Sequence, residues 1–434
     1  MVHLPAAPSG KELEDYVAAM FQATGYYVDK NIIDERGPEQ VLELDVVLTD
    51  YGGGLPKSTI VEVKSGGWGF TDIFKIRGWM AYLGIGQGVL FTSTRPPNKD
   101  IDFAQRKAAT LDIRLICCPD ANPSEMSKAF QDAGYPVSAD DIVVTNWRWS
   151  LWVERRLLEV IRHECKVNPH SNGPREALNY YRLVNNGIFF EPDARERAAA
   201  LYDAYRTHPR LSASICAEIG GEQWDPQPSA SSFRRVLNDA LNAGNYPLVQ
   251  ASLYLEHRAR LALLKAAVDY VVLRDNGRLP VMPVKQLGID DLWLASLPES
   301  FRAGLEKLRT HPNLVRYPYF WQVFLWCWGG FILTDRRDQE YEELSRQTGV
   351  PVDEIPMALS AMDLLFPGQG WIANWEPTSH MEVVKLFPMP FRGVGAFYRL
   401  GRYGVEDYKQ LGYNSSTLGN LVTWHNNTVE LLET

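Results

Sequence analysis

Two acidic residues and a lysine stand at spacings that suit the hydrolysis of a phosphodiester bond. Glu62 and Lys64 are two residues apart in the apolar segment 59–64, so in a β-strand both side chains point to one face. Asp45 lies in the preceding apolar segment, 41–48. Two carboxylates can hold a divalent cation that stabilises charge on a phosphate. A lysine beside them can position the attacking water, deprotonate it or stabilise that charge.

The turn between these two strands sets their register. Residues 50–57 are rich in glycine, and if the hairpin closes on Gly53 and Gly54, Asp45 lies directly opposite Glu62. Directly opposed residues have Cβ atoms about 5 Å apart, so both carboxylates can reach one cation. Glu43 is a rival for Asp45, because residues two apart in a strand share a face.

The elements around this pair predict a mixed β-sheet flanked by helices, an α/β architecture. Leu13, Tyr16 and Val17 recur at helical spacing after a Ser9-x-x-Glu12 capping pattern, so the chain opens with a helix. The order that follows is β-β-β-α-β-α-β. The predicted strands are 26–33, 41–48, 59–64, 88–92 and 113–117, and the later helices are 71–83 and 101–110.

These residues resemble a known family of nucleases. The stretch from Gly10 to Cys117 is similar to the PD-(D/E)XK superfamily and, within it, to the Mrr-like restriction endonucleases. The motifs that carry the resemblance are Gly10-Lys-Glu-Leu-Glu14, Glu43-Leu-Asp45, Glu62-Val-Lys64 and Gly88-Val-Leu-Phe-Thr92. The family pattern has proline where this chain has Leu44, and many Mrr-like members have glutamine at the position of Glu62.

The resemblance implies a restriction-endonuclease-like fold and a defined set of site residues. Carried over by position, the catalytic residues are Glu14, Asp45, Glu62 and Lys64, and the metal ligands are Asp45 and Glu62. The cation would be Mg²⁺, with Mn²⁺ as a substitute. The activity would be endonucleolytic cleavage of DNA in bacterial restriction or anti-phage defence. A homodimer or higher assembly is expected, because cutting both strands needs two sites.

Two alternatives to this function stay open on the sequence. In one, the nuclease is an effector that a ligand or a protein of the same defence system activates through the region after the sheet. In the other, the nuclease fold is catalytically silent and serves as a binding module. Cleavage in Mg²⁺ that is lost with Lys64→Ala would exclude the second alternative.

Three further residues are candidates for contact with nucleic acid. Trp68 follows two glycines and could stack on a base, although a tryptophan packed on the sheet in a tight loop is the alternative. Lys75 and Arg77 lie on the next helix and could contact phosphates, although a solvated helix face is an equal alternative.

The remainder of the chain has a different character. Residues 1–120 form the nuclease domain and 121–148 a linker region, whereas 149–367 have helical periodicity and would sense, bind a partner or select substrate. Residues 340–367 have a helix-turn-helix pattern typical of a winged-helix-like module, but its second helix has no lysine or arginine to meet phosphates. Residues 368–434 would form a small α/β segment.

Charge and composition limit the partners and the compartment. The formal net charge is −9, which argues against a protein that coats nucleic acid and favours a local, metal-assisted contact with DNA. The most apolar stretch, 319–333, is shorter than a membrane span and predicts a buried helix. The five cysteines form no CxxC pair, and Met1–Gly10 has no signal-peptide pattern, so we expect a cytoplasmic protein with reduced thiols.

Overall fold

The computed structural model describes most of the chain and divides it into two units. It describes residues 4–170, except 6–7, 37–38 and 95–99; residues 175, 178, 189 and 191–207; residues 246–279; residues 289–365, except 329 and 334–335; and residues 375–377 and 381–384. The first unit comprises residues 1–152 and 185–192, and the second comprises 153–184 and 193–434.

A five-stranded mixed sheet forms the centre of the first unit. Its strands lie side by side in chain order, with β1–β2 and β2–β3 antiparallel and β3–β4 and β4–β5 parallel. This is the predicted mixed sheet with flanking helices. The strands are β1 (Tyr27–Arg36), β2 (Glu39–Asp50), β3 (Lys57–Lys64), β4 (Gln87–Thr92) and β5 (Ile113–Cys117).

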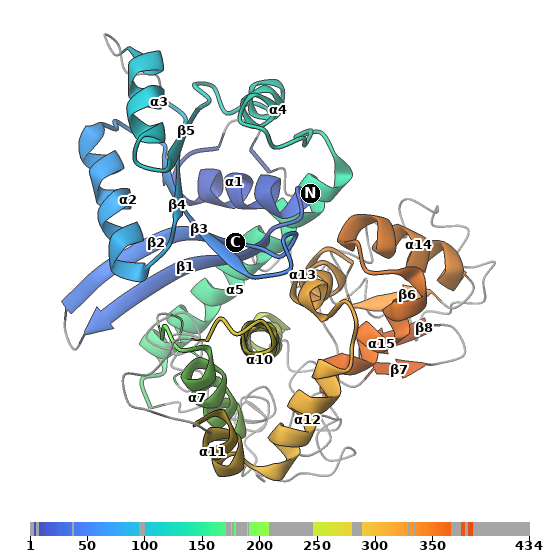
Figure 1. Cartoon of the computed structure of the whole chain (residues 1–434). Coiled ribbons are helices and arrows are strands. Elements are labelled where there is room, and N and C mark those ends of the chain that lie inside the picture. The colour runs from blue at the N-terminus through green and yellow to red at the C-terminus, as the bar shows by residue number, and fades with distance from the viewer. Residues whose placement is uncertain are drawn as a thin grey trace. The chain divides into compact units, whose positions relative to one another are not determined.

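Helices cover both faces of this sheet. Helices α1 (Lys11–Ala23) and α4 (Pro123–Asp132) lie on one side, and α2 (Phe70–Leu83) and α3 (Ile101–Ala109) lie on the other (Figure 1). Alternation along β3 directs Ile60 toward α2, where it packs with Ile73 and Ile76. The same alternation carries Glu62 and Lys64 to the α2 face, as the spacing predicts.

The helix starts differ from the expected pattern at one point. The first helix begins after Gly10, whose φ of 54° is a left-handed conformation that glycine adopts at low cost, and no side chain caps it. The predicted Ser9–Glu12 capping box is therefore wrong. Instead, the backbone N–H of Gly10 donates to Ser65 Oγ at 3.1 Å, which ties the start of α1 to the loop after Lys64.

Helix α4 belongs to the core of the first unit. Phe130 is fully buried, and its ring centre lies 5.0 Å from that of Phe21 on α1 and 6.1 Å from that of Phe91 on β4. The region predicted as a linker, residues 121–148, thus supplies side chains that pack on the sheet. The boundary between the units falls inside α5 (Ile142–Val167).

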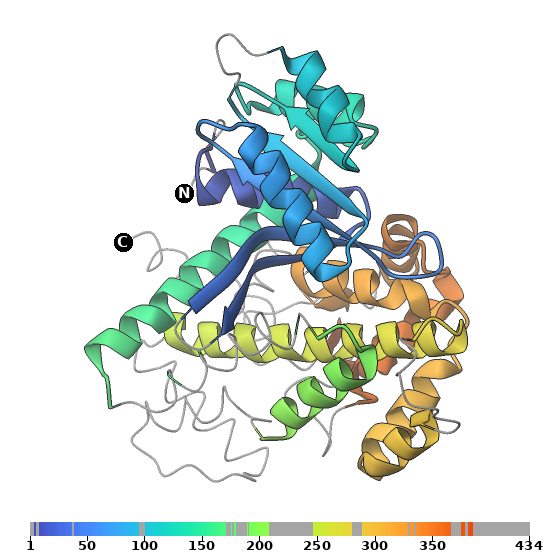
Figure 2. The same cartoon turned by 60° about the vertical axis from the view of Figure 1, so that its left-hand side comes forward.

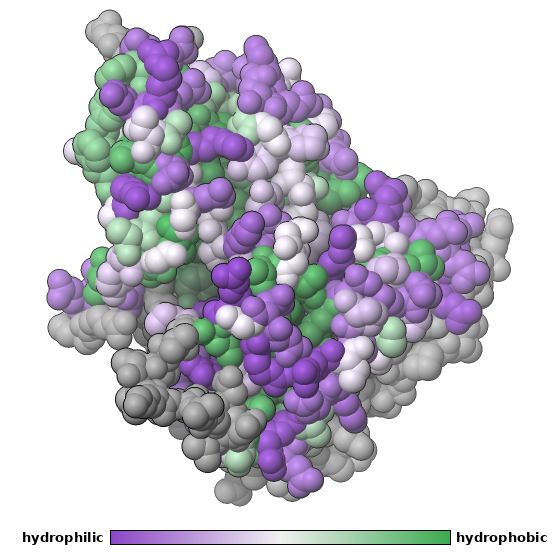
Figure 3. All heavy atoms as spheres, viewed as in Figure 1, coloured by the Kyte–Doolittle hydropathy of each residue, from purple (hydrophilic) through white to green (hydrophobic). Residues whose placement is uncertain are grey.

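The outer face of α2 is unusually apolar for a helix at the surface. Figure 3 shows apolar residues, in green, over α2 and α3. Phe74 is 62% exposed, and Phe70 meets Phe103 of α3 edge to face with ring centres 6.0 Å apart. Because α2 has apolar residues on both faces, an amphipathic pattern alone does not show which face is buried. Packing on the sheet determines that face.

The described part of the second unit is mainly helical, as the periodicity predicts. The long helix α10 (Tyr246–Asp275) contacts α7 (Ala194–Thr207), α12 (Glu299–Arg309) and α13 (Tyr317–Gln322) (Figure 2). Helix α11 (Ile289–Ser296) places Trp293 against Tyr270 of α10. Residues 208–245, which belong to the region 149–367 predicted to be helical, lie outside the described residues.

The apolar stretch at 319–333 is a buried helical segment as far as Cys327, as predicted, but its last three residues form a strand. Helix α13 continues into a π-helical turn, Val323–Cys327, in which every side chain is buried. Strand β6 (Phe331–Leu333) follows. No helix in the described parts of the chain is long and apolar enough to cross a membrane.

The segment predicted to resemble a winged helix, residues 340–367, contains short helices, and the strands of a small sheet lie before and after it in the chain. Helix α14 (Arg337–Thr348) ends at Gly349, whose φ is 70°, and α15 (Ile355–Ser360) follows. Strands β7 (Trp375–Pro377) and β8 (Met381–Val384) complete an antiparallel sheet in the order β6-β8-β7. The rest of the predicted C-terminal α/β segment lies outside the described residues.

Candidate active site

The β2–β3 hairpin has the register that the sequence predicts. Paired residues run from Asp50 with Lys57 to Val46 with Val61, and one further step places Asp45 opposite Glu62. At this point the ladder ends, and the backbone N–H of Val63 donates to Asp45 Oδ2 at 2.9 Å. Val63 directly follows Glu62 in the chain, so this hydrogen bond holds the Asp45 carboxylate beside the end of β3.

Glu62 is the buried acid of the group. Its side chain is 3% exposed, and its Oε1 atom lies 2.5 Å from the Nζ atom of Lys64. Lys64 also lies 3.9 Å from Asp72 Oδ1 at the start of α2. Burial lowers the pKa of Lys64, but the hydrogen bond and the charge of Glu62 outweigh it, so the pKa is raised overall. Lys64 is therefore an ammonium at neutral pH, which favours charge stabilisation over deprotonation of water.

Asp45 carries the electrostatic strain of the group. Burial, followed by the negative charges of Glu62 and Glu14, raises the pKa of Asp45 to about 7. The Val63 N–H and the ammonium of Lys11 act in the opposite direction, more weakly. A carboxyl group with this pKa is only partly ionised at neutral pH, and a nearby cation would favour its charged form.

Glu14 joins the group from α1. It is buried, and its Oε2 atom lies 3.1 Å from Lys11 Nζ, one helical turn away. Lys11 also approaches Glu43 Oε1 at 3.7 Å, so Glu43 lies beside the group at its exposed side. Sequence reasoning missed Lys11, although its position three residues before Glu14 was a signal for an ion pair.

The donor set fits a divalent cation in its chemistry. Asp45, Glu62 and Glu14 supply only carboxylate oxygens, the ligands that Mg²⁺ prefers, and their like charges raise the pKa of Asp45. Within the described ranges, no group of three or more His, Cys, Asp or Glu side chains is arranged to hold a metal ion. In the structure, Glu62 and Glu14 form ion pairs with Lys64 and Lys11 instead.

The three candidate nucleic-acid contacts have different positions. Trp68 is 6% exposed and packs in the core, and its Nε1 donates to the carbonyl of Thr94 at 3.0 Å. This position agrees with the alternative of a tryptophan packed on the sheet, and not with stacking on a base. Arg77 is partly exposed, 3.5 Å from Asp112. Lys75 points into the carboxylate group, with its Nζ atom 3.0 Å from Glu62 Oε1.

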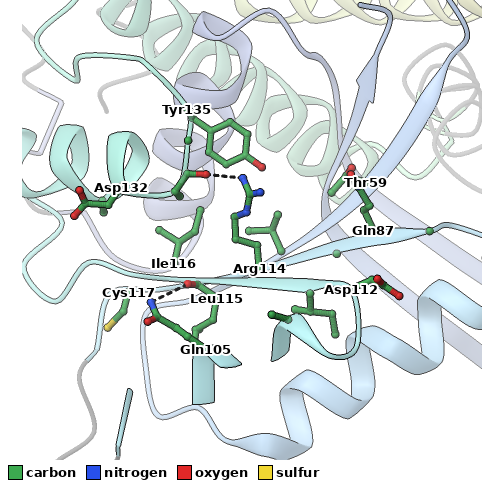
Figure 4. Close-up of a pocket in the computed structure, with 18 residues that line it drawn as sticks. Thr59, Gln87, Gln105, Asp112, Arg114, Leu115, Ile116, Cys117, Asp132 and Tyr135 are labelled. Carbon is green, nitrogen blue, oxygen red and sulfur yellow. Dashed lines mark hydrogen bonds between the residues drawn. The ribbon is translucent and has the colours of Figure 1, made fainter. Parts of the chain in front are cut away.

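A cavity of about 700 Å³ lies elsewhere in the first unit, along β5. Figure 4 shows Arg114 pointing toward α4, where it donates to the carbonyl of Ala133 beside the ring of Tyr135. On the other side of the strand, Gln105 donates to the carbonyl of Leu115 at 3.3 Å. None of the seven predicted site residues lines this cavity, so the carboxylate group and the cavity are separate features.

Comparisons with protein families, with curated proteins and with solved structures gave no match.

Proposed function

We propose that the protein is a Mg²⁺-dependent endonuclease that hydrolyses phosphodiester bonds of DNA through a PD-(D/E)XK-type site. One observation carries the proposal: the register and the Val63 N–H hold Asp45 beside Glu62, and Lys64 lies 2.5 Å from Glu62. A structural surface rarely retains two neighbouring carboxylates at the end of buried strands, because like charges opposed across strands are destabilising.

Each residue has a separate task in the proposed site. Asp45 and Glu62 would hold the cation, which supplies a Lewis acid for the charge that develops on the phosphate. Lys64, an ammonium at neutral pH, would stabilise a phosphate oxygen or orient the attacking water. Glu14 would add negative charge that favours the cation, and Lys11 would hold Glu14 in place.

The test is cleavage of supercoiled plasmid by the full chain, in MgCl₂ and in EDTA. We expect Mg²⁺-dependent nicking or linearisation, and a rate at least about 100-fold lower for Lys64→Ala and Glu62→Gln. Lys107→Ala is the matched control, because Lys107 lies on α3 against Phe103 and belongs to none of the ion pairs in the described residues. Wild-type protein that cleaves no DNA in Mg²⁺ or Mn²⁺, or a Lys64→Ala variant with unchanged rate, would contradict the proposal.

A further inference from the structure

Two lysines contact the same oxygen of the buried Glu62 carboxylate. Lys64 Nζ lies 2.5 Å and Lys75 Nζ lies 3.0 Å from Glu62 Oε1. Lys64 belongs to the motif from which the site is proposed, whereas Lys75 comes from α2 and has no place in that motif. The second ammonium thus needs its own explanation.

Lys75 is the more easily displaced of the two. Its side chain is 43% exposed, compared with 27% for Lys64. Lys64 also has Asp72 within 3.9 Å, which keeps it at the site. The Nζ atom of Lys75 lies 4.2 Å from the ring centre of Trp79, where a cation can stay with little desolvation. The ammonium thus contacts the ring and Glu62 from one position, so a shift away from Glu62 would leave it the favourable contact with Trp79.

A divalent cation held by Glu62 would compete with Lys75 for the same carboxylate oxygen. Two positive groups within a few ångströms repel each other strongly where water is scarce, and Glu62 is almost fully buried. Binding of the cation would therefore release the ammonium of Lys75 from Glu62. A long, half-exposed side chain at the edge of a nuclease site can then reach a backbone phosphate.

We propose that Lys75 is an exchangeable counter-cation of the site. It neutralises Glu62 in the metal-free protein, yields that carboxylate to the divalent cation, and pairs with a phosphate of the bound DNA. The inference rests on the proposed function and adds a positioning residue to it. Replacing a purely structural lysine would change stability alone. Replacing an exchanging lysine would change the affinity for the divalent cation and the affinity for DNA in opposite directions.

The variant Lys75→Met separates these roles, because methionine keeps an apolar stem against Trp79 and removes the charge. We expect the affinity for Mn²⁺ to rise about three- to tenfold, since one competing positive charge is gone. We expect the affinity for duplex DNA to fall, and the slope of its logarithm against the logarithm of salt concentration to decrease by about one. Lys75→Arg keeps the charge and should stay near wild type in both.

The experiment uses the full chain in two assays. Calorimetric titration with MnCl₂ measures the affinity for the cation in the absence of DNA. Fluorescence anisotropy of a labelled duplex in Ca²⁺, over a series of NaCl concentrations, measures the affinity for DNA and its salt dependence. Lys107→Met is the matched control, because it removes an ammonium that lies over an aromatic ring without touching the site. Thermal melting of each variant verifies that it is folded.

The outcomes separate this inference from the proposed function. If the wild type binds Mn²⁺ and Lys75→Met binds it with equal or weaker affinity, the role of Lys75 is overturned and the proposed function stays intact. A DNA salt slope that is unchanged in Lys75→Met overturns the phosphate contact. Absence of Mn²⁺ binding in wild type and in every variant overturns both.

Discussion

Asp45 bears an energetic cost in the metal-free protein. Its pKa is raised to about 7 by burial and by the charges of Glu62 and Glu14, from an ordinary value near 4. The folded chain therefore binds this proton more tightly than the unfolded chain does. By linkage, stability falls as the pH rises from about 4 to about 7, and the loss is complete above pH 7.

The substitution Asp45→Asn tests this cost. In EDTA at pH 8, we expect the free energy of unfolding to rise by about 1–3 kcal/mol, because the amide accepts the Val63 hydrogen bond without a charge. The gain should shrink as the pH is lowered toward 4. Denaturant titrations at several pH values measure it, with the half-exposed Glu43→Gln as the control on the same strand. A variant that is less stable than wild type at pH 8 would show that Asp45 is not strained.

At the scale of elements, the sheet and its register could be predicted, but the packing of α4 could not. Apolar alternation and a glycine-rich turn determine the β2–β3 pairing, so Asp45, Glu62 and Lys64 could be placed together from the sequence. A short amphipathic helix such as α4 has the same pattern in a linker as in a core. The contact of Lys75 with Glu62 was equally out of reach, because a long side chain finds a partner on another element only after the elements have packed.

The substitution Phe130→Ala tests whether α4 is part of the core. Phe130 is fully buried against Phe21, Phe91 and Tyr135, so we expect a loss of about 3–5 kcal/mol in the free energy of unfolding of the first unit. Hydrogen exchange of the β4 and β5 amides in the full chain measures the loss where it occurs. The exposed Lys128→Ala on the same helix should change stability by less than about 0.5 kcal/mol. Equal exchange in both variants would show that α4 is a linker.

At the scale of the whole molecule, the proposed chemistry occupies the first unit, and the net charge of −9 would affect how the protein binds the proposed DNA substrate. An acidic protein gains little from non-specific attraction to phosphates, so in the proposed complex a cation between the protein carboxylates and the DNA would have a correspondingly larger part in binding. The second unit, built around α10, is the part in which a requirement for a partner or ligand would reside.

The most direct test of the account is the position of a divalent cation in the protein. Crystals of the full chain grown in MnCl₂ would give an anomalous difference map in which Mn²⁺ is identified without assumption. We predict a peak bound by carboxylate oxygens of Asp45 and Glu62 at roughly 2 Å, with Lys64 retained and Lys75 released from Glu62. A map at saturating Mn²⁺ with no peak at these carboxylates, and with both lysines still on Glu62, would contradict the assignment of this site.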